Sequence, residues 1–278
     1  MARTVPRIAV IVSTYNQPRW LEKVLWGYGA QTRTDFRLLI ADDGSGAETA
    51  AVIEAARARF GERLQRIWHP DQGFRKCEIL NRAILAAAAD YLVFSDGDCI
   101  PRADFIERHG RLARPGRFLS GGVVWLPRSL SEAITEADVA YGAVARAHWL
   151  AERGWAGGRH RLRMLHHSGM AGLLDRLTTT RPTFNGHNAS AWRSDIIAVN
   201  GFDAEMGYGG LDRAVGERLE NLGIRGLQAR HRLVAFHLDH DRPYRRPEVV
   251  RSNREIRARI RRERLIRAVR GIAELEPT

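Results

Sequence analysis

The chain has 278 residues, of which 44% are hydrophobic and 27% charged, and this ordinary composition fits one large globular domain. Two cysteines, Cys77 and Cys99, are too few for a disulfide framework in a chain of this length. The most apolar stretch, at 83–95, is too short for a membrane-spanning helix. The formal net charge of +12 predicts an acidic partner, such as nucleic acid, an anionic membrane surface or a phosphorylated substrate.

The N-terminal part of the chain alternates strands with helices. The continuous apolar run at 8–12 is typical of a parallel strand buried on both faces, and Pro18 suits the first turn of the helix that follows. The same patterns predict a strand at 36–40, a helix at 47–60, a strand at 64–68, a helix at 77–89 and a strand at 91–94. This alternation indicates an open α/β sheet, in which ligands bind beyond the carboxyl ends of the strands.

The pattern becomes less regular after residue 118. We expect a helix at 130–150, a strand at 188–192, a helix around Asp195, a helix at 215–222 and a strand at 233–236. Trp125, Trp149 and Trp155 are candidates for stacking on a ligand ring, with packing in the core or against a helix at least as good an explanation for each.

The segment from Arg245 to Arg270 holds much of the positive charge, with eleven arginines against three glutamates. Its apolar residues fall on two different helical faces, which predicts a helix that bends or changes partner. One interpretation is a basic surface beside anionic lipid head groups, where each cation contributes ~1 kcal/mol. The other is a solvated helix without a partner. We expect no nucleic-acid partner, because the segment lacks aromatic side chains beyond Tyr244 on which bases could stack.

Two pairs of carboxylates follow predicted strands. Asp96 and Asp98 are separated by one glycine and can share a hard divalent cation that brings substrate phosphates with it. Asp42 and Asp43 can accept hydrogen bonds from a nucleobase or from ribose hydroxyls. An ordinary turn or helix cap is the alternative for both pairs.

Cations stand before and within the helix that precedes Asp96. Arg75 and Lys76 can complement the oxygens of a donor diphosphate, and Asn81-Arg82 follows within the helix. Solvated surface charge is the alternative interpretation.

These motifs resemble family 2 glycosyltransferases of the GT-A fold and follow one another in that family's order. They are Val-Ser-Thr-Tyr-Asn at 12–16, Asp-Asp-Gly-Ser at 42–45, Gly-Phe-Arg-Lys at 73–76, Asn-Arg-Ala at 81–83 and Asp-Gly-Asp at 96–98. The segments at 185–188, 200–203 and 207–210 are similar to the C-terminal part of galactosyltransferase-like members. The resemblance covers residues 7–240.

The resemblance implies an α/β fold with a Rossmann-like mixed sheet flanked by helices. A nucleotide-sugar-binding half would cover 1–118, an acceptor-binding and catalytic half of the same domain 119–240, and a basic helical tail 241–278.

The resemblance also implies roles for single residues. Asp212 would be the catalytic base, and Asp98 would bind Mn²⁺ or Mg²⁺ together with a histidine, for which His240 is slightly preferred over His237. The expected donor-binding residues, among which Asp43 would lie near a uracil, are Ser13, Thr14, Asp42, Asp43, Arg75, Lys76, Asn81 and Asp96. The expected acceptor-binding residues are Gly210, His187 and Asn188, although the last two can instead satisfy buried backbone groups.

Two positions depart from the family's pattern. Leu211 stands where a glutamate is usual, and Ala214 stands where another acid is common. Because the missing glutamate helps to hold the acceptor in family members, the identity of the acceptor stays open.

The resemblance implies an inverting, metal-dependent transfer of a hexose or N-acetylhexosamine from a UDP-sugar to a glycan or a lipid-linked glycan. Bacterial surface polysaccharide or lipopolysaccharide synthesis is the expected setting. The alternatives are a member that binds nucleotide sugar with little or no transfer, and a nucleotidyltransferase. Because the first residues run directly into a strand, we expect a cytoplasmic protein without a signal peptide, peripheral at the inner face of the membrane if the basic tail binds lipid.

Overall fold

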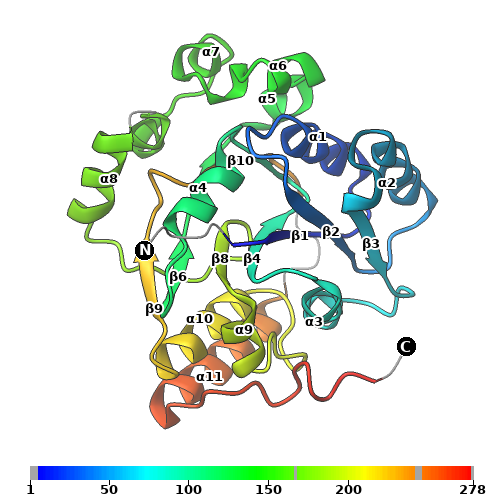
Figure 1. Ribbon diagram of the computed structural model, residues 1–278, viewed down its shortest axis with the longest axis vertical. Coiled ribbons are helices and arrows are strands. Elements are labelled where there is room, and N and C mark those ends of the chain that lie inside the picture. Colours follow the sequence, from blue (N-terminus) through cyan, green and yellow to red (C-terminus); the bar gives the residue numbers. More distant parts are fainter. Residues whose placement is uncertain (1–5, 166–167, 242–245, 277–278) are drawn as a thin grey trace.

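The strands of the computed structural model, which describes residues 6–165, 168–241 and 246–276, form two sheets (Figure 1). In chain order the strands are β1 (Ile8–Thr14), β2 (Phe36–Asp42), β3 (Leu64–Trp68), β4 (Tyr91–Asp96), β5 (Cys99–Pro101), β6 (Arg117–Ser120), β7 (Gly122–Trp125), β8 (Ala189–Trp192), β9 (Arg225–Gln228) and β10 (Val234–His237). The larger sheet has the order β3-β2-β1-β4-β8-β6-β9, and the smaller one has the order β5-β10-β7. Because β8 is antiparallel to β4 and β6 while β1 to β4 are parallel, the larger sheet is mixed.

The central strand β1 shows why the sequence has an unbroken apolar run at 8–12. All seven of its residues are buried. Since side chains alternate along a strand, Ile8, Val10 and Val12 pack into a hydrophobic core on one face of the sheet, and the residues between them pack into a second core on the other face.

The helices divide between these two cores (Figure 1). In chain order they are α1 (Pro18–Gly29), α2 (Ala47–Phe60), α3 (Lys76–Ala86), α4 (Phe105–Leu112), α5 (Arg128–Ala133), α6 (Glu136–Ala140), α7 (Ala147–Glu152), α8 (Ser168–Leu177), α9 (Arg193–Ala198), α10 (Leu211–Asn221) and α11 (Pro247–Glu263). Buried residues of α1, α2 and α4 belong to the first core, and those of α3, α9, α10 and α11 belong to the second. Short 3₁₀ turns lie at 61–63, 143–145 and 158–164.

The predicted α/β class is confirmed, as is the alternation of strands and helices up to residue 96. The helix expected at 77–89 ends earlier, at Ala86, because Ala87 is already extended.

The single helix expected at 130–150 is wrong. The chain forms α5, α6 and α7 instead, because Thr135 and Asp138 make a capping box that starts a new helix. Gly142, in the left-handed conformation at φ +67°, then separates α6 from the next turn.

From its sequence, the C-terminal segment is expected to form a helix that bends or changes partner, but the helix ends instead, and the chain continues against other residues without helical structure. Helix α11 packs on α10 through Ile260 and ends at Arg264, which has a left-handed φ of +52°. The following residues run along α9 without forming a helix, where Asn200 donates a hydrogen bond to the carbonyl of Ala268. The interpretation of α11 as a solvated helix without a partner is therefore wrong. Arg245, where the basic segment begins, lies outside the described residues.

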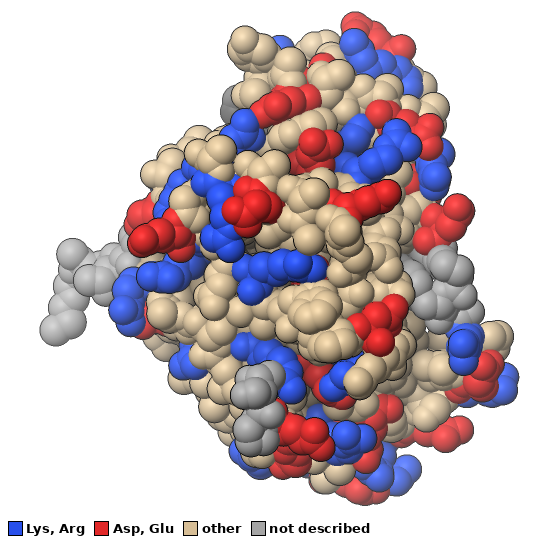
Figure 2. All heavy atoms as spheres, turned by 90° about the vertical axis from the view of Figure 1, so that its right-hand side faces the viewer, with Lys and Arg blue, Asp and Glu red and all other residues tan. Residues whose placement is uncertain are grey.

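The net positive charge does not gather in one surface patch on the face shown in Figure 2, where acidic and basic side chains are interspersed. On α11 itself, Arg257 and Arg261 both pair with Glu217 of α10. No helix in the described parts of the chain combines the length and the apolar character needed to cross a bilayer.

Ile260→Ala is expected to lower the free energy of unfolding by ~2–5 kcal/mol, because this side chain is 3% exposed in the second core. Urea unfolding followed by circular dichroism measures the change. The control is Ser252→Ala, an exposed position of the same helix, which is expected to change stability by less than about 0.5 kcal/mol. An Ile260→Ala protein as stable as the control would show that α11 adds nothing to the fold.

Candidate active site

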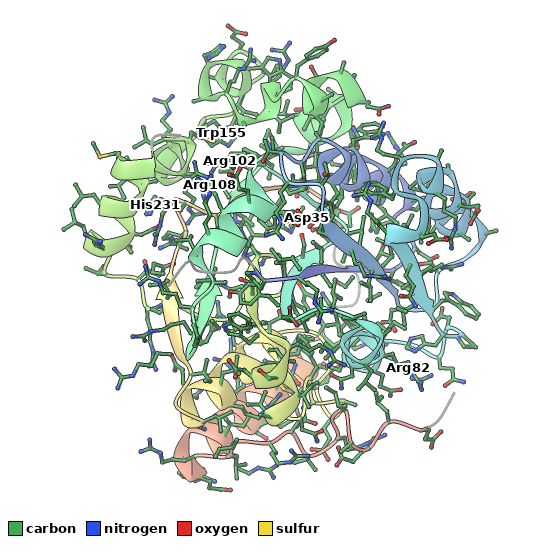
Figure 3. The ribbon with its side chains drawn as sticks, viewed as in Figure 1. Asp35, Arg82, Arg102, Arg108, Trp155 and His231 are labelled. Atoms are coloured by element: carbon green, nitrogen blue, oxygen red, sulfur yellow. The ribbon has the colours of Figure 1, made fainter. Side chains whose placement is uncertain are left out.

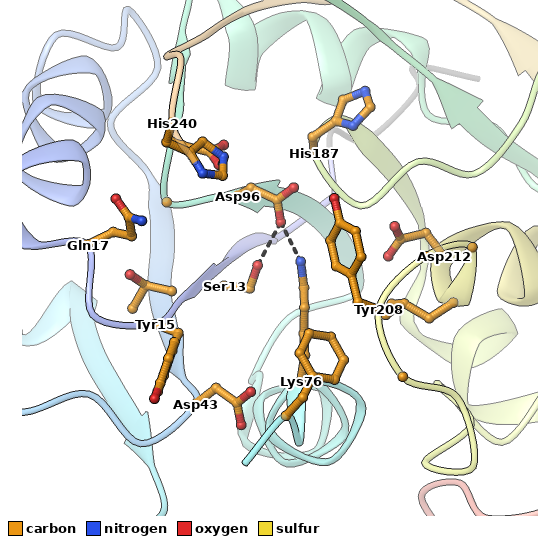
Figure 4. A pocket seen from close by; sticks show the side chains of 18 of the residues that line it. Ser13, Tyr15, Gln17, Asp43, Lys76, Asp96, His187, Tyr208, Asp212 and His240 are labelled. Atoms are coloured by element: carbon orange, nitrogen blue, oxygen red, sulfur yellow. Dashed lines mark hydrogen bonds and ion pairs between the residues drawn. The ribbon is translucent and has the colours of Figure 1, made fainter. Parts of the chain in front are cut away.

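A pocket of about 750 Å³ lies beyond the carboxyl ends of β1, β2 and β4, where the sequence predicts ligand binding. Figure 4 shows Asp43 and Tyr15 toward one end of the pocket, Asp212 and His187 toward the other, and Asp96 between them. The predicted site residues that line this pocket are Ser13, Thr14, Asp43, Lys76, Asp96, Asp98, His187, Gly210, Asp212, His237 and His240.

The Asp96 carboxylate ties three elements together at the floor of the pocket. One of its oxygens accepts hydrogen bonds from Ser13 Oγ of β1 and from Lys76 Nζ of α3, both at 2.7 Å (Figure 4). Burial opposes the charge of Asp96, but the neighbouring Lys76 ammonium outweighs it and lowers the pKa of this carboxyl. Burial likewise opposes the charge of Lys76, and Asp96 and Asp212 raise its pKa. The pair is therefore ionised at neutral pH.

Asp98 faces two imidazoles from the end of β10. His240 Nε2 lies 2.8 Å from one carboxylate oxygen, and His237 Nε2 lies 3.6 Å from the other. Burial tends to raise the pKa of Asp98, but the two histidines lower it below its ordinary value.

The same three groups offer oxygen and nitrogen atoms of the kinds that divalent cations take as ligands. Nδ1 of His237 lies 2.7 Å from the Leu238 carbonyl and Nδ1 of His240 2.8 Å from the Asp241 carbonyl, so Nδ1 carries the proton in each ring. In a neutral ring Nε2 then has a lone pair that faces a carboxylate oxygen, and this arrangement requires a proton or a metal ion between them.

Cys99 is a neighbour of this cluster and not a thiolate. Its Sγ lies within ligand distance of Asp98 and His237, and its S–H donates to Asp98 Oδ1 at 3.1 Å. Burial and the two nearby carboxylates raise the pKa of this thiol well above 9.0, so it stays protonated. Oxygen and imidazole nitrogen are thus the ligand atoms that the site offers.

Asp212 stands in the first turn of α10. Burial raises the pKa of this carboxyl from 3.8 to about 6, with Lys76 lowering it and Asp96 raising it. Its Oδ1 is buried and has no hydrogen-bond partner in the described parts of the chain. A Cβ at position 186 would lie 2.4 Å from Oδ1, so only the glycine found there leaves room for the carboxylate. The arrangement provides a carboxylate that can accept a proton near neutral pH.

Asp43 and His187 also line the pocket. Asp43 is held by His69 Nε2 at 2.7 Å and by the backbone N–H of Arg75 at 3.1 Å. Burial lowers the pKa of His187 to about 4, so its imidazole is neutral at pH 7.

Four predicted site residues lie outside the pocket: Asp42, Arg75, Asn81 and Asn188. Asp42 is fully buried and accepts from Arg66 of β3 at 2.6 Å and from the Ser45 N–H at 2.9 Å. The guanidinium of Arg75 bonds Glu78 and Gln72.

The two asparagines satisfy buried backbone. Asn81 exchanges two hydrogen bonds of 2.8 Å with the backbone of Phe202. Asn188 donates to the carbonyls of Gly122 and Leu233, and this is the structural alternative that the sequence left open.

The pocket also contains residues to which the sequence analysis assigned no role. Phe74 and Tyr208 meet edge to face with ring centroids 6.3 Å apart. Arg246 and Val249 reach the pocket from the C-terminal segment, which sequence alone gave no reason to place there.

Of the three tryptophans, Trp125 lines the pocket and lies 3.9 Å from the His237 ring, centroid to centroid. Trp155 is buried, and its indole N–H donates to the Trp125 carbonyl (Figure 3). Trp149 lies under the Arg153 guanidinium.

Residues 9–120 match the family described as "Glycosyl transferase family 2". The validoxylamine A glucosyltransferase of Streptomyces hygroscopicus subsp. jinggangensis is 26% identical over 233 residues, which are 79% of this chain and 53% of that protein. The putative glycosyltransferase EpsE of Bacillus subtilis is 27% identical over 111 residues, which are 37% of this chain and 40% of that protein. The chain thus spans about half the length of the glucosyltransferase that it matches.

Solved structures show a similar fold. The mannosyltransferase PcManGT from Pyrobaculum calidifontis, in complex with GDP-Man and Mn²⁺, has a TM-score of 0.56 at 20% identity, covering 87% of this chain and 59% of that one. S. aureus TarS 1-349 in complex with UDP has a TM-score of 0.59 at 14% identity, covering 91% of this chain and 64% of that one. The fold is GT-A-like, as predicted.

Asp212→Asn is expected to stabilise the fold at pH 8, by an amount that shrinks as the pH falls toward 4. A carboxyl whose pKa rises from 3.8 to about 6 on folding favours the folded state only while protonated, so its charge destabilises the fold increasingly above pH 4. The uncharged amide avoids this cost, and the expected gain at pH 8 is ~1–3 kcal/mol. Denaturant unfolding across this pH range measures the gain. A gain that does not depend on pH would contradict the raised pKa.

Proposed function

The chain belongs to glycosyl transferase family 2, and on this premise we propose that it transfers a hexose or N-acetylhexosamine from a UDP-sugar to an acceptor hydroxyl, with inversion. One observation carries the proposal. A single pocket contains the Asp96–Lys76 ion pair, the Asp98–histidine cluster and a half-buried Asp212 with a raised pKa.

The nucleoside of the donor would occupy the end of the pocket near Asp43. Because His69 and the Arg75 backbone hold the Asp43 carboxylate in place, it can accept the N3–H of a uracil without reorganising. The two structural neighbours were solved with different nucleobases, since the TarS complex contains UDP and the PcManGT complex contains GDP-Man. The preference for uridine therefore rests on Asp43.

The diphosphate would lie between Lys76 and the group formed by Asp98, His237 and His240. Lys76 keeps its positive charge because Asp96 pairs with it, and this places a fixed ammonium beside phosphate oxygens. Asp98 and the two histidines would hold Mn²⁺ or Mg²⁺. When bound there, such an ion neutralises charge on the departing nucleoside diphosphate.

Asp212 would act as the general base. Its Oδ1 has no hydrogen-bond partner in the described parts of the chain, and a pKa of about 6 leaves it ionised at neutral pH. It can therefore accept the proton of an acceptor hydroxyl as that hydroxyl attacks the anomeric carbon. Attack opposite the leaving diphosphate inverts the configuration.

The departures from the family pattern bear on the acceptor. Leu211 and Ala214 are both buried and pack into the second core, so neither supplies a polar group to an acceptor. Since Asp212 keeps its place, we favour an active transferase over a member that only binds nucleotide sugar. Bacterial surface polysaccharide or lipopolysaccharide synthesis, the division at residue 118 and a cytoplasmic location at the inner face of the cell membrane stay predictions.

Release of UDP is expected from one member of a panel of UDP-sugars in the presence of Mn²⁺, and not in the presence of EDTA. Asp98→Ala is expected to abolish this release, because the variant removes the carboxylate that faces both histidines. GDP-sugars are assayed beside the UDP-sugars to test which nucleobase the donor carries. Equal release with Mn²⁺ and with EDTA would overturn metal dependence. Release of pyrophosphate from UTP and a sugar 1-phosphate, in a parallel assay, would indicate a nucleotidyltransferase.

Asp212→Asn is expected to lower kcat by about 10²–10⁴-fold while the KM for the donor changes little, because the amide cannot take the proton. For the native protein, kcat/KM should rise with pH through about 6 and then level off, as the carboxyl loses its proton. Steady-state kinetics across pH measures both, and NMR of the product gives the anomeric configuration. Retention of configuration, or full activity of the variant, would rule out the proposed role of Asp212.

A further inference from the structure

A second hollow of about 310 Å³ opens beside Asp212. It shares His187, Gly209, Gly210 and Asp212 with the main pocket, so a ligand that occupies it lies against the proposed base. The residues that line only the second hollow are Asn185, Arg213, Val250, Arg254 and Arg257.

Two helices bring the three arginines together. Arg213 follows Asp212 in the first turn of α10, while Arg254 and Arg257 stand on α11. Val250, Arg254 and Arg257 are spaced by four and three residues, so they share one face of α11 and turn toward the hollow together.

The three guanidinium groups are not equally engaged. Arg257 is fixed by Glu217, at 2.6 and 3.3 Å, and packs against Gly210. Arg213 and Arg254 are exposed, and neither makes an ion pair within the described parts of the chain. Asp212 is the only acidic residue among those that line the hollow, so the hollow has a net positive charge.

The main pocket already contains the groups that a donor diphosphate needs. Lys76 and the Asp98–histidine cluster lie there, and neither borders the second hollow. The arginines are therefore left for a different anion, one that approaches Asp212 from the α11 side. Within a glycosyl transfer, the reactant that meets the base is the acceptor.

We propose that the acceptor carries an oxyanion, a phosphate or a carboxylate, which Arg213 and Arg254 bind in the hollow between α10 and α11, and this inference rests on the function proposed above. The planar guanidinium fork matches the paired oxygens of either group. Binding of the anion there would orient the acceptor hydroxyl toward Asp212. It also gives the arginine-rich α11 a role in substrate binding, where the sequence suggested a membrane surface.

Calorimetry on the full chain saturated with UDP and Mn²⁺ tests the proposal, because UDP then occupies the main pocket. The probes are glucose 1-phosphate, glucuronic acid, inorganic phosphate and neutral methyl glucoside. We expect at least one anionic probe to bind and methyl glucoside not to bind, and the anion that binds identifies phosphate or carboxylate as the group. Arg254→Gln and Arg213→Gln should each weaken binding by roughly 10- to 100-fold, the loss that follows from removing one charge-assisted hydrogen bond.

The matched control is Arg259→Gln. Arg259 is an exposed arginine on the same helix that lines neither pocket, and the variant removes the same charge from the chain. It should bind the anionic probe as the native protein does. Equal loss in Arg259→Gln and Arg254→Gln would reduce the effect to net charge, and no binding of any anion would overturn the proposal. UDP binding in the same samples distinguishes failure of the anion site from failure of the proposed function, because a protein that does not bind UDP would contradict the proposed function itself.

Discussion

The site depends on one partly buried ion pair, between Lys76 at the start of α3 and Asp96 at the end of β4. Bringing two charges out of water is costly, and an apolar pair could replace them in a core that needed only stability. Ser13, which faces Asp96 in the register of β1 and β4, donates to the same carboxylate oxygen. The pair therefore fixes a positive charge at the point where three elements meet, and the proposed binding of a diphosphate uses this charge.

Environment then assigns different roles to similar carboxylates. A neighbouring cation lowers the pKa of Asp96, so this group stays charged and organises the floor of the pocket. Burial raises the pKa of Asp212 to about 6, which makes it a far better proton acceptor than an ordinary aspartate. Groups whose surroundings move their pKa values apart are the usual mark of divided acid–base labour. Here the two carboxylates lie in one pocket.

The sequence predicted those parts of the fold and site that depend on local patterns. The apolar run of β1 predicts that both faces of the sheet are covered by other elements. The acidic residues that follow the predicted strands indicate where the pocket lies. Adjacent residues at a strand end point to opposite sides, so Asp42 and Asp43 could not both face a ligand, and no local pattern says that Arg66 claims Asp42. Likewise, no local pattern shows that Asn81 bonds the backbone of Phe202, because the two residues are distant in sequence. The prediction of a single helix at 130–150 did not take into account the capping box that begins at Thr135, although the sequence contains this signal.

The C-terminal helix shows what a charge count cannot reveal. The eleven arginines at 245–270, the segment that contains α11, suggested a separate surface. Asn253 of α11 is nevertheless buried, and it donates to the carbonyls of Gly207 and Gly209 in the loop that leads into α10 and Asp212. A buried amide that holds backbone carbonyls of a glycine-rich loop restricts the freedom of that loop. Because Val249 also packs against Gly207 and reaches the pocket, α11 forms part of the wall beside the proposed base. The anion site proposed between α10 and α11 therefore depends on the loop that Asn253 holds.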